Sequence, residues 1–533
     1  MKDTLIICII MIVIIIIYFM YYMTHTIPKN NIHHQENFTN SIREINFDEI
    51  NVDILIVGGG PSGIYSAWRL SQAYPEKKII VVEEKSFLGG RLESIYFGNT
   101  EIYAEMGGMR TFPNTDIYLT ALLKKLNKPT IERPYIRPNN TAYFKNTRFM
   151  SGVVNISSSA NPQKQLLIQT YKIPPREYNL SNNMVIDNAV EIAAPGYQTN
   201  PRSVFYSNTL NNQTFVEMLK NQYVSNASIE IFHDFSGYNF SVVAPLAASM
   251  GIRENISISG IDKQHFVVGG YASFVDKMAQ ETFIGKNVHL LLSTKLKKII
   301  PNSIGFNTCV LESEHGCRFI VKAKSVILAI PKAGFDKLDI PVTPIVQQAM
   351  ASLSVWRAFK AFLLVDELTY RILSRNYTIE GRCVSDLPAR QIWLYTKNPP
   401  CVLVYCDDDS ADFWYRYTTS KINNEYPQIQ DPETNIPLVS ELVRQISIVF
   451  GVKIENICVK EIIYKYWNAG AYFSKPSDIP VLLSESKTPL GKEYNVFMVG
   501  SDISYSQGWV DGAIETADNL LVERYNLESI LNF

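Results

Sequence analysis

The sequence predicts an α/β protein in which one nucleotide-binding unit is assembled from separate stretches of a 533-residue chain. Residues 51–84 read as a buried strand, a glycine-rich turn, apolar residues at helical spacing and a second buried strand, which together are typical of a βαβ unit. Strand patterns return as one strand at residues 287–299 and as a strand pair at residues 317–331. A last strand, loop and helix begin near residue 496.

Two interleaved domains and a membrane segment account for the chain. We expect a transmembrane signal anchor at residues 1–24 and a polar tether at residues 25–50, which lacks apolar periodicity. Residues 51–115, 260–335 and 480–533 would form the nucleotide-binding domain, and residues 116–259 and 336–479 a substrate domain with a helical insertion.

An uninterrupted apolar run at residues 5–23 predicts the anchor, because at helical rise it nearly spans a hydrocarbon core of about 30 Å. A cleaved signal peptide would need a shorter run followed by small residues. Tyr21, Tyr22 and His25 stand there instead. The better interpretation is an uncleaved single-pass anchor, which predicts that the protein is located at a membrane.

The side of the membrane on which the folded part lies is encoded only weakly. Lys2 and Lys29 flank the apolar run and nearly balance the positive-inside signal. A lumenal or exterior catalytic domain is favoured by glycosylation sequons, although an Asn-rich chain also produces them by chance. These sequons include Asn37, Asn155, Asn226 and Asn376.

Composition excludes several classes of partner and site. The 50 basic and 51 acidic residues leave a net charge of −1, so no global basic field indicates a nucleic-acid partner. Seven scattered cysteines form neither a disulfide framework nor a metal cluster. Cys309 and Cys317 flank a predicted turn and could form one bridge. There is no metal-ligand spacing, nucleophile elbow or Walker loop.

The glycine-rich turn carries a dinucleotide-binding fingerprint. Gly58, Gly60 and Gly63 match GxGxxG, with Pro61 and Ser62 inside the loop. Glycines there allow a tight turn and a close approach to pyrophosphate, and the following helix presents its N-terminus to phosphate. The second strand ends about 20 residues later at Glu83 and Glu84, where an acid binds ribose hydroxyls and disfavours NADP. This pattern leaves FAD and NAD open.

The segment FLGGRLES, residues 87–94, resembles the GGR segment of the flavin-containing amine oxidase superfamily. The resemblance implies a Rossmann-like FAD-binding domain of the amine oxidase type, with Gly90 and Arg91 near the cofactor phosphates. It also implies that the backbone of Leu296 meets the adenine. Ala471 stands where monoamine oxidases carry the cysteine that binds flavin covalently, so the resemblance implies noncovalent FAD.

Residues 499–513 resemble the closing motif of the same superfamily, which passes the ribityl chain and pyrophosphate. The implied cofactor contacts are Gly500, Ser501, Asp502, Gly508, Trp509 and Val510. Many relatives have Gly-Glu where this chain has Gly500-Ser501. Asp502 could replace the missing contact.

The segment AEMGGMRTF, residues 104–112, is similar to the Gly-x-Met-Arg segment of L-amino acid oxidases and of tryptophan or phenylalanine 2-monooxygenases. That resemblance implies that Gly107, Gly108 and Met109 pass close to the flavin ring. Arg110, which lies beside them, would bind the substrate carboxylate through its planar, forked donors. The alternative is that Arg110 forms only a structural ion pair.

Further matches to L-amino acid oxidases predict the rest of the site. SDLPARQIWLY, residues 385–395, resembles a segment that adds a tyrosine hydroxyl to the substrate carboxylate, which makes Trp393 and Tyr395 candidates. Lys360 matches a catalytic lysine that contacts flavin N5 through water and assists reaction with oxygen. Tyr472 and Trp509 match aromatic walls of the substrate cavity. Each of these aromatic residues could instead be packed in the core.

The function that these matches imply is FAD-dependent oxidation of an L-amino acid. A hydride would pass from Cα to flavin N5, and oxygen would reoxidise the flavin, giving a 2-oxo acid, ammonia and hydrogen peroxide. The alternatives are an amino acid 2-monooxygenase, an amine or polyamine oxidase, and an inert membrane-tethered flavoprotein. The expected partners are a small-molecule substrate, oxygen and a membrane, and the protein could form a homodimer.

Overall fold

The computed structural model describes residues 50–97, 103–134, 139–239, 245–258, 263–284, 287–375, 381–418, 428–430 and 432–532. The predicted anchor and the tether up to residue 49 lie outside the described residues. Among the residues that the structure does describe, no helix combines the length and the apolar character that crossing a bilayer requires.

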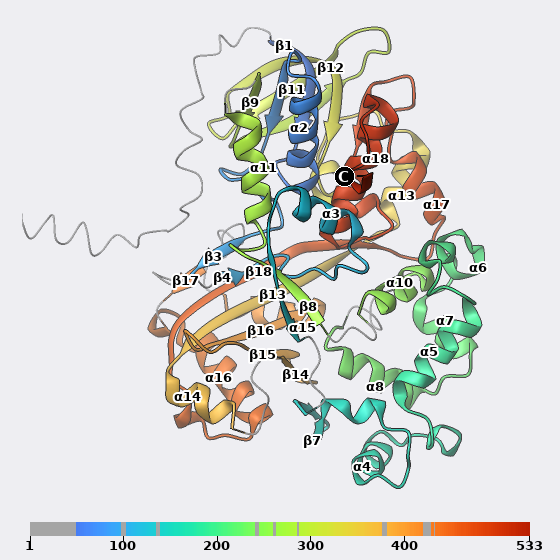
Figure 1. Ribbon diagram of the computed structural model, residues 1–533, viewed down its shortest axis with the longest axis vertical. Coiled ribbons are helices and arrows are strands. Elements are labelled where there is room, and N and C mark those ends of the chain that lie inside the picture. The colour runs from blue at the N-terminus through green and yellow to red at the C-terminus, as the bar shows by residue number, and fades with distance from the viewer. Residues whose placement is uncertain are drawn as a thin grey trace, which may run out of the picture.

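A seven-stranded mixed sheet lies in the upper part of the molecule in Figure 1. It confirms the predicted βαβ unit. β1 (Ile50–Val57) leads into α2 (Pro61–Ala73), and β2 (Ile79–Val82) returns parallel to β1. The sheet order is β10 (Thr294–Ile300), β11 (Asn307–Ser313), β12 (Arg318–Leu328), β1, β2 and β9 (Val288–Leu291), with β19 (Val496–Met498) also paired to β12.

Two strand predictions in this sheet were wrong in detail. Residues 287–299 do not form one strand, because Ser293 adopts a left-handed conformation with φ of 49° and separates β9 from β10. Residues 317–331 do not form a strand pair, because β12 runs unbroken and changes partner along its length. Its first half pairs with β11 and its last residues pair with β19.

Cys309 and Cys317 do not form a bridge. Cys309 is buried in β11 opposite Val321, whereas Cys317 is exposed, and both thiols are free. The predicted turn is present, but the register of the two strands sets the cysteines away from each other.

Helices cover both faces of the first sheet. α2, α3 (Ile117–Lys125), α11 (Ser273–Phe283) and α18 (Val510–Tyr525) share one buried apolar cluster with β1, β2 and β9. A second cluster on the other face includes residues of α12 (Lys332–Phe335), α13 (Pro344–Ala351) and α17 (Ile479–Glu485). The glycine-rich turn between β1 and α2 therefore lies at the edge of a sheet whose two faces are both covered by buried apolar clusters.

An eight-stranded sheet forms the second half and is built around two long strands. Its order is β17 (Gln428–Gln430), β18 (Val459–Ser474), β13 (Leu353–Val365), β16 (Cys401–Asp407), β15 (Gln391–Thr396), β14 (Arg382–Ser385), β6 (Thr141–Phe144) and β7 (Thr147–Met150). One face packs on α14 (Glu367–Leu373), α15 (Asp408–Tyr415) and α16 (Ile436–Phe450). Because side chains alternate along a strand, residues 358, 360 and 362 of β13 point to the other face.

A group of short helices, called the helical insertion below, lies within residues 116–259. It comprises α4 (Pro162–Tyr171), α5 (Asn182–Ala193), α6 (Asn208–Asn211), α7 (Phe215–Asn221), α8 (Asn226–Ser236) and α10 (Ala248–Ile258), which lie together at the lower right of Figure 1. α8 ends at Gly237, which has a φ of 74°. That left-handed residue turns the chain toward the second sheet.

Candidate active site

One cavity of about 950 Å³ lies between the two sheets and the helical insertion. Most of the residues predicted for cofactor or substrate line it. They are Gly58, Gly60, Pro61, Ser62, Glu83, Glu84, Gly90, Arg91, Gly107, Gly108, Met109, Arg110, Leu296, Lys360, Gly500, Ser501, Asp502, Gly508, Trp509 and Val510. Gly63, Trp393, Tyr395 and Tyr472 do not line it.

The glycine-rich loop has the close approaches that its sequence predicts. A Cβ on Gly58, whose φ is 111°, would lie 2.3 Å from the Ala329 carbonyl oxygen, and one on Gly63 would lie 1.9 Å from the Gly58 carbonyl oxygen. Gly63 thus permits packing inside the loop and does not face the cavity. A Cβ on Gly60 would have its nearest neighbour at 3.8 Å, so this glycine leaves open space at the N-terminus of α2.

Glu83 fixes the shape of this loop. Its carboxylate accepts hydrogen bonds from the backbone N–H of Gly59 at 2.6 Å and of Lys85 at 2.8 Å. Burial raises the pKa of Glu83, while these two donors favour its charged form. Glu84 is half exposed and pairs with Lys295 at 2.6 Å, so its carboxylate is held at the rim of the cavity.

Arg91 joins the first glycine-rich region to the closing motif. Its Nη2 donates to Ser501 Oγ at 2.9 Å and to Asp502 Oδ1 at 3.0 Å. Asp502 Oδ2 in turn accepts from the backbone N–H of Lys332 at 2.9 Å. Ser501, the departure from the Gly-Glu pattern, therefore binds Arg91 directly. A Cβ on Gly500 would meet no atom within 4 Å, which leaves space on the cavity side.

These features fit FAD. The loop after β1 offers glycine space and a helix N-terminus that would receive a phosphate. Glu83 lies at the end of β2, where an acid would meet the ribose, and Arg91 would supply a cation for the pyrophosphate. Ala471 lines the cavity, and no cysteine of the described residues does. The residues present are thus suited to a flavin that is bound without a covalent link.

Lys360 lies on β13 at the centre of the cavity wall. Its Nζ donates to the carbonyl oxygens of Glu105 at 2.9 Å and Gly107 at 2.5 Å, and it lies 4.8 Å from the centre of the Tyr405 ring. Burial lowers the pKa of Lys360 to about 7. This lysine therefore holds the loop that carries Arg110, and its burial favours the neutral amine more than water would.

Arg110 also lines the cavity and is held from several sides. Its guanidinium donates from Nη2 to the Tyr238 hydroxyl at 2.8 Å. The guanidinium carbon lies 5.8 Å from the centre of the Phe112 ring and 5.6 Å from that of Trp393. The side chain is 7% exposed, and the next residue, Thr111, exchanges backbone hydrogen bonds with His265. Arg110 is thus a buried cation that its neighbours orient toward the cavity.

Three predicted substrate contacts need correction. Trp393 packs against Arg110 and does not reach the cavity, and Tyr395 packs in the core with Phe266 and Phe362. Tyr472 packs against the first sheet, whereas Ala471 and Phe473 on either side of it line the cavity. Strand alternation turns Tyr472 away, because successive side chains point to opposite faces. Trp393 and Tyr395 do share the sheet face of Lys360, but they are packed in an apolar cluster that includes Phe112.

Sequence reasoning missed several residues that do line the cavity, namely Tyr238, Glu254, Trp356, Tyr405, Lys465, Trp467 and Phe473. Lys465 lies opposite Lys360 in the pairing of β18 with β13 and binds both carboxylate oxygens of Glu93, at 2.5 and 2.6 Å. One signal was present in the sequence. Lys465, like Lys360, is a lysine within an apolar strand, where an unpaired charge would be costly.

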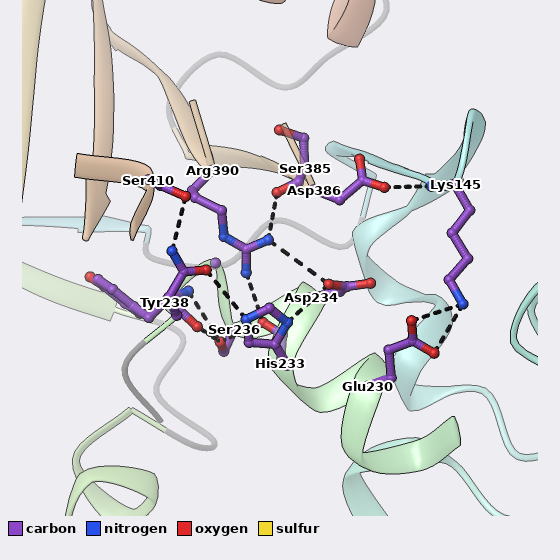
Figure 2. A network of polar contacts seen from close by, with 12 residues as sticks. Lys145, Glu230, His233, Asp234, Ser236, Tyr238, Ser385, Asp386, Arg390 and Ser410 are labelled. Atoms are coloured by element: carbon purple, nitrogen blue, oxygen red, sulfur yellow. Dashed lines mark hydrogen bonds and ion pairs between the residues drawn. The ribbon is translucent and has the colours of Figure 1, made fainter. Parts of the chain in front are cut away.

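A polar network behind Tyr238 connects the helical insertion with the second sheet (Figure 2). Arg390, buried with a φ of 46°, donates to the carbonyl oxygens of Ser385 at 2.9 Å and His233 at 3.0 Å. Asn239, next to Tyr238, donates to Asp407 through its backbone N–H at 2.8 Å and through its side chain at 2.9 Å. Tyr238 is thereby fixed in place over Arg110.

Trp509 stands at the N-terminus of α18 and forms another part of the wall. Its indole N–H donates to Glu254 Oε1 at 3.0 Å and Oε2 at 3.1 Å, and its ring meets Phe112 edge-on at 5.6 Å. Burial raises the pKa of Glu254 to about 7. Within the part of the chain that the structure describes, no group of acidic, histidine and cysteine side chains is suited to hold a metal ion.

Comparisons with known proteins agree with this geometry. The model of the family described as flavin containing amine oxidoreductase matches residues 61–519. An uncharacterized protein of Acanthamoeba polyphaga mimivirus is 56% identical over 486 residues, covering 91% of this chain and 96% of the relative. Aplysianin-A from Aplysia kurodai is 23% identical over 546 residues, covering 90% and 91%.

Two further similarities bear on the fold. An L-amino-acid oxidase from Siganus canaliculatus is 19% identical over 495 residues, covering 90% of this chain and 86% of the relative. A solved structure of a wild-type putrescine oxidase bound to putrescine aligns with a TM-score of 0.63 at 18% identity, covering 90% of this chain and all of that one. The two proteins share the fold.

Proposed function

The chain belongs to the flavin containing amine oxidoreductase family, and we propose that within this family the protein is an oxidase of L-amino acids. It is an FAD-dependent oxidoreductase, and the flavin of these enzymes is usually bound noncovalently. The proposed reaction converts an L-amino acid, oxygen and water to a 2-oxo acid, ammonia and hydrogen peroxide, because the imino acid formed by the oxidation is hydrolysed.

The observation that carries this proposal is the position of Arg110. Its guanidinium lies in the cavity wall, hydrogen-bonded to Tyr238 and supported by the Phe112 and Trp393 rings. A simple amine offers nothing for this cation to bind, whereas an α-amino acid presents a carboxylate that suits its forked donors. A buried cation is costly, so its presence in a substrate cavity favours an anionic ligand.

The protein's own residues have mainly positioning roles in this scheme. When FAD is bound, it supplies the acceptor for two electrons and the α-hydrogen. Arg110 and Tyr238 would hold the carboxylate, which fixes the orientation of Cα. Trp509 and Phe473 would line the space around the bound substrate and exclude water. Lys360, with a pKa lowered to about 7, can hold or release a proton beside the loop that carries Arg110.

Product analysis tests the proposal. The purified full-length protein would be incubated in air with single L-amino acids and, separately, with their decarboxylated amines, while oxygen uptake, peroxide and ammonia are measured. We expect a 2-oxo acid with peroxide from amino acids. An amide with carbon dioxide would instead indicate a 2-monooxygenase, and turnover of amines alone would indicate an amine oxidase with a structural Arg110.

The apolar run at residues 5–23 supports a further part of the proposal, namely that the enzyme is anchored to a membrane. Expression of the full chain and of residues 25–533, followed by alkaline carbonate extraction, tests this part. The full chain is expected to stay with the membranes and the shortened chain to be released. Release of both would contradict the anchor.

A further inference from the structure

The acidic side chains that line the cavity fall into two groups. Among the described residues they are Glu83, Glu84, Asp502 and Glu254. The first three belong to the segments that would hold the cofactor. Glu83 binds two backbone N–H groups, Glu84 pairs with Lys295, and Asp502 pairs with Arg91.

Glu254 differs from these three in its place and in its partners. It lies on α10, in the helical insertion. Among the described residues, its hydrogen bonds come from one neutral donor, the Trp509 indole, at 3.0 and 3.1 Å. A carboxylate has about four acceptor positions, so Glu254 keeps capacity toward the cavity.

Glu254 and Arg110 lie at the two ends of an aromatic wall. From Arg110 the wall runs through the Phe112 ring, at 5.8 Å, to the Trp509 ring, 5.6 Å further on, and Trp509 binds Glu254. The cavity therefore presents a cation at one end and an anion at the other. The apolar indole face between them suits a chain of methylene groups.

We propose that Glu254 is a cation subsite, which binds the side-chain ammonium or guanidinium of a basic L-amino acid whose carboxylate is held by Arg110. The inference rests on the proposed function, because it places the α-carboxylate on Arg110. It names the substrate class as L-amino acids with a positively charged end on a flexible aliphatic side chain, such as L-lysine and L-arginine.

The charge arrangement gives this subsite its selectivity. A side-chain cation would complete the acceptor positions of Glu254 with a charge-assisted hydrogen bond. An acidic side chain would meet a like charge at the same place, and an apolar side chain would leave the carboxylate without a counter-charge. The order of preference is therefore basic, then apolar, then acidic amino acids.

A binding measurement tests the subsite without relying on turnover. The probes are 6-aminohexanoate, which has a carboxylate and a distant ammonium but no α-amine, and hexanoate, which lacks the ammonium. Isothermal titration of the FAD-loaded protein is expected to show that 6-aminohexanoate binds about 10- to 100-fold more tightly. In Glu254→Gln, which keeps an acceptor for Trp509 but loses the charge, this preference should collapse.

The chain offers a matched control in Glu281. This exposed glutamate of α11 also accepts a hydrogen bond from an indole, that of Trp68 at 2.7 Å, but it does not line the cavity. Glu281→Gln should keep the full preference for 6-aminohexanoate. Equal affinities of the two probes for the wild-type protein, or an equal loss in both variants, would overturn the inference.

Turnover separates failure of the subsite from failure of the proposed function. We expect kcat/KM for L-lysine to exceed that for L-norleucine about 10- to 100-fold, and the ratio to approach one in Glu254→Gln. If both substrates slow equally in that variant, Glu254 acts on the α-amine and the subsite is wrong. The protein could instead oxidise cadaverine but no amino acid, while still binding 6-aminohexanoate more tightly than hexanoate. That result would support the cation subsite and overturn only the proposal that the protein is an amino acid oxidase.

Discussion

The Arg110 guanidinium donates a hydrogen bond of 2.8 Å to the Tyr238 hydroxyl, although the two residues come from different parts of the fold. Arg110 follows β4 (Tyr103–Glu105), whereas Tyr238 follows α8 within the helical insertion. The end of the cavity that holds Arg110 is therefore complete only when the insertion is docked. Asn239 and Arg390 provide that docking through hydrogen bonds to Asp407 and His233 respectively.

Tyr238→Phe removes the hydroxyl that orients Arg110. We expect KM for L-amino acids to rise about tenfold with a smaller change in kcat, because a hydrogen bond to a charged group is lost from the bound state. Steady-state kinetics measure this change. Tyr206→Phe is the control, since that tyrosine is 67% exposed. An unchanged KM in Tyr238→Phe would show that the hydroxyl does not help to bind the carboxylate.

Binding of 6-aminohexanoate should depend on pH through Glu254. Burial raises the pKa of Glu254 to about 7, although the charge of Arg253 and the indole N–H of Trp509 lower it, and Asp116 raises it further. Glu254 is therefore neutral below this pKa and charged above it, whereas the ligand ammonium stays charged throughout. The affinity for 6-aminohexanoate should rise from pH 6 to pH 8, which titration calorimetry would measure. The affinity for hexanoate, which has no ammonium, should not show this rise.

We expect the stability of the folded protein to depend strongly on the buried ion pair between Lys465 and Glu93. Their side chains are 1% and 6% exposed. Lys465→Met leaves the buried carboxylate of Glu93 with only the longer ion pair to Lys85, at 3.4 Å, and should lower the free energy of unfolding by up to about 3–5 kcal/mol. The double change Lys465→Met with Glu93→Leu should recover much of that loss.

Urea unfolding at a fixed FAD concentration measures these differences, because bound cofactor itself adds stability. The exposed pair of Lys145 and Glu230 supplies the control. Lys145→Met should change the free energy of unfolding by less than about 1 kcal/mol. If the double variant were no more stable than Lys465→Met, the loss would come from packing and not from the unpaired charge.

Arg91→Met should weaken FAD binding. The side chain joins Ser501 and Asp502 at the position expected for the cofactor pyrophosphate, and its charge would be lost while its packing volume is largely kept. When FAD is removed and then added back, we expect the Kd for FAD to be about tenfold or more higher in Arg91→Met than in the wild type. This is the effect of losing about one charge-assisted contact. The control is Arg318→Met, which removes an exposed ion pair with Glu312 and should bind FAD like the wild type. Equal affinities for FAD in all three proteins would refute the role of Arg91.

The spacing of residues in the sequence predicted those parts of the molecule that depend on neighbouring residues. The βαβ unit follows from apolar periodicity, and the glycines of its turn follow from the close approaches that only glycine permits. Lys360 was recognisable because a lysine in an apolar strand needs buried partners, and two carbonyl groups supply them. Resemblance to a family then placed Arg110 and Arg91 correctly in one cavity.

The rest of the site depends on which face of an element meets a distant segment. Tyr472 and Phe473 are adjacent aromatics in one strand, and only the sheet-to-sheet packing shows that Phe473 faces the cavity. Trp393 lies near the right place but is covered by Arg110 itself. Tyr238 and Glu254 come from a helical insertion whose polar sequence carries no sign of the cavity wall to which it contributes.

The most direct test of the central claim is anaerobic reduction of the FAD-loaded protein by an L-amino acid and by its matching decarboxylated amine, in the wild type and in Arg110→Met. Flavin absorbance reports the reaction in each case. If Arg110 holds the substrate carboxylate, the amino acid will bleach the wild-type flavin, the amine will do so far more slowly, and Arg110→Met will lose most of this discrimination. Equal bleaching by both compounds, or discrimination that survives in Arg110→Met, would contradict the account.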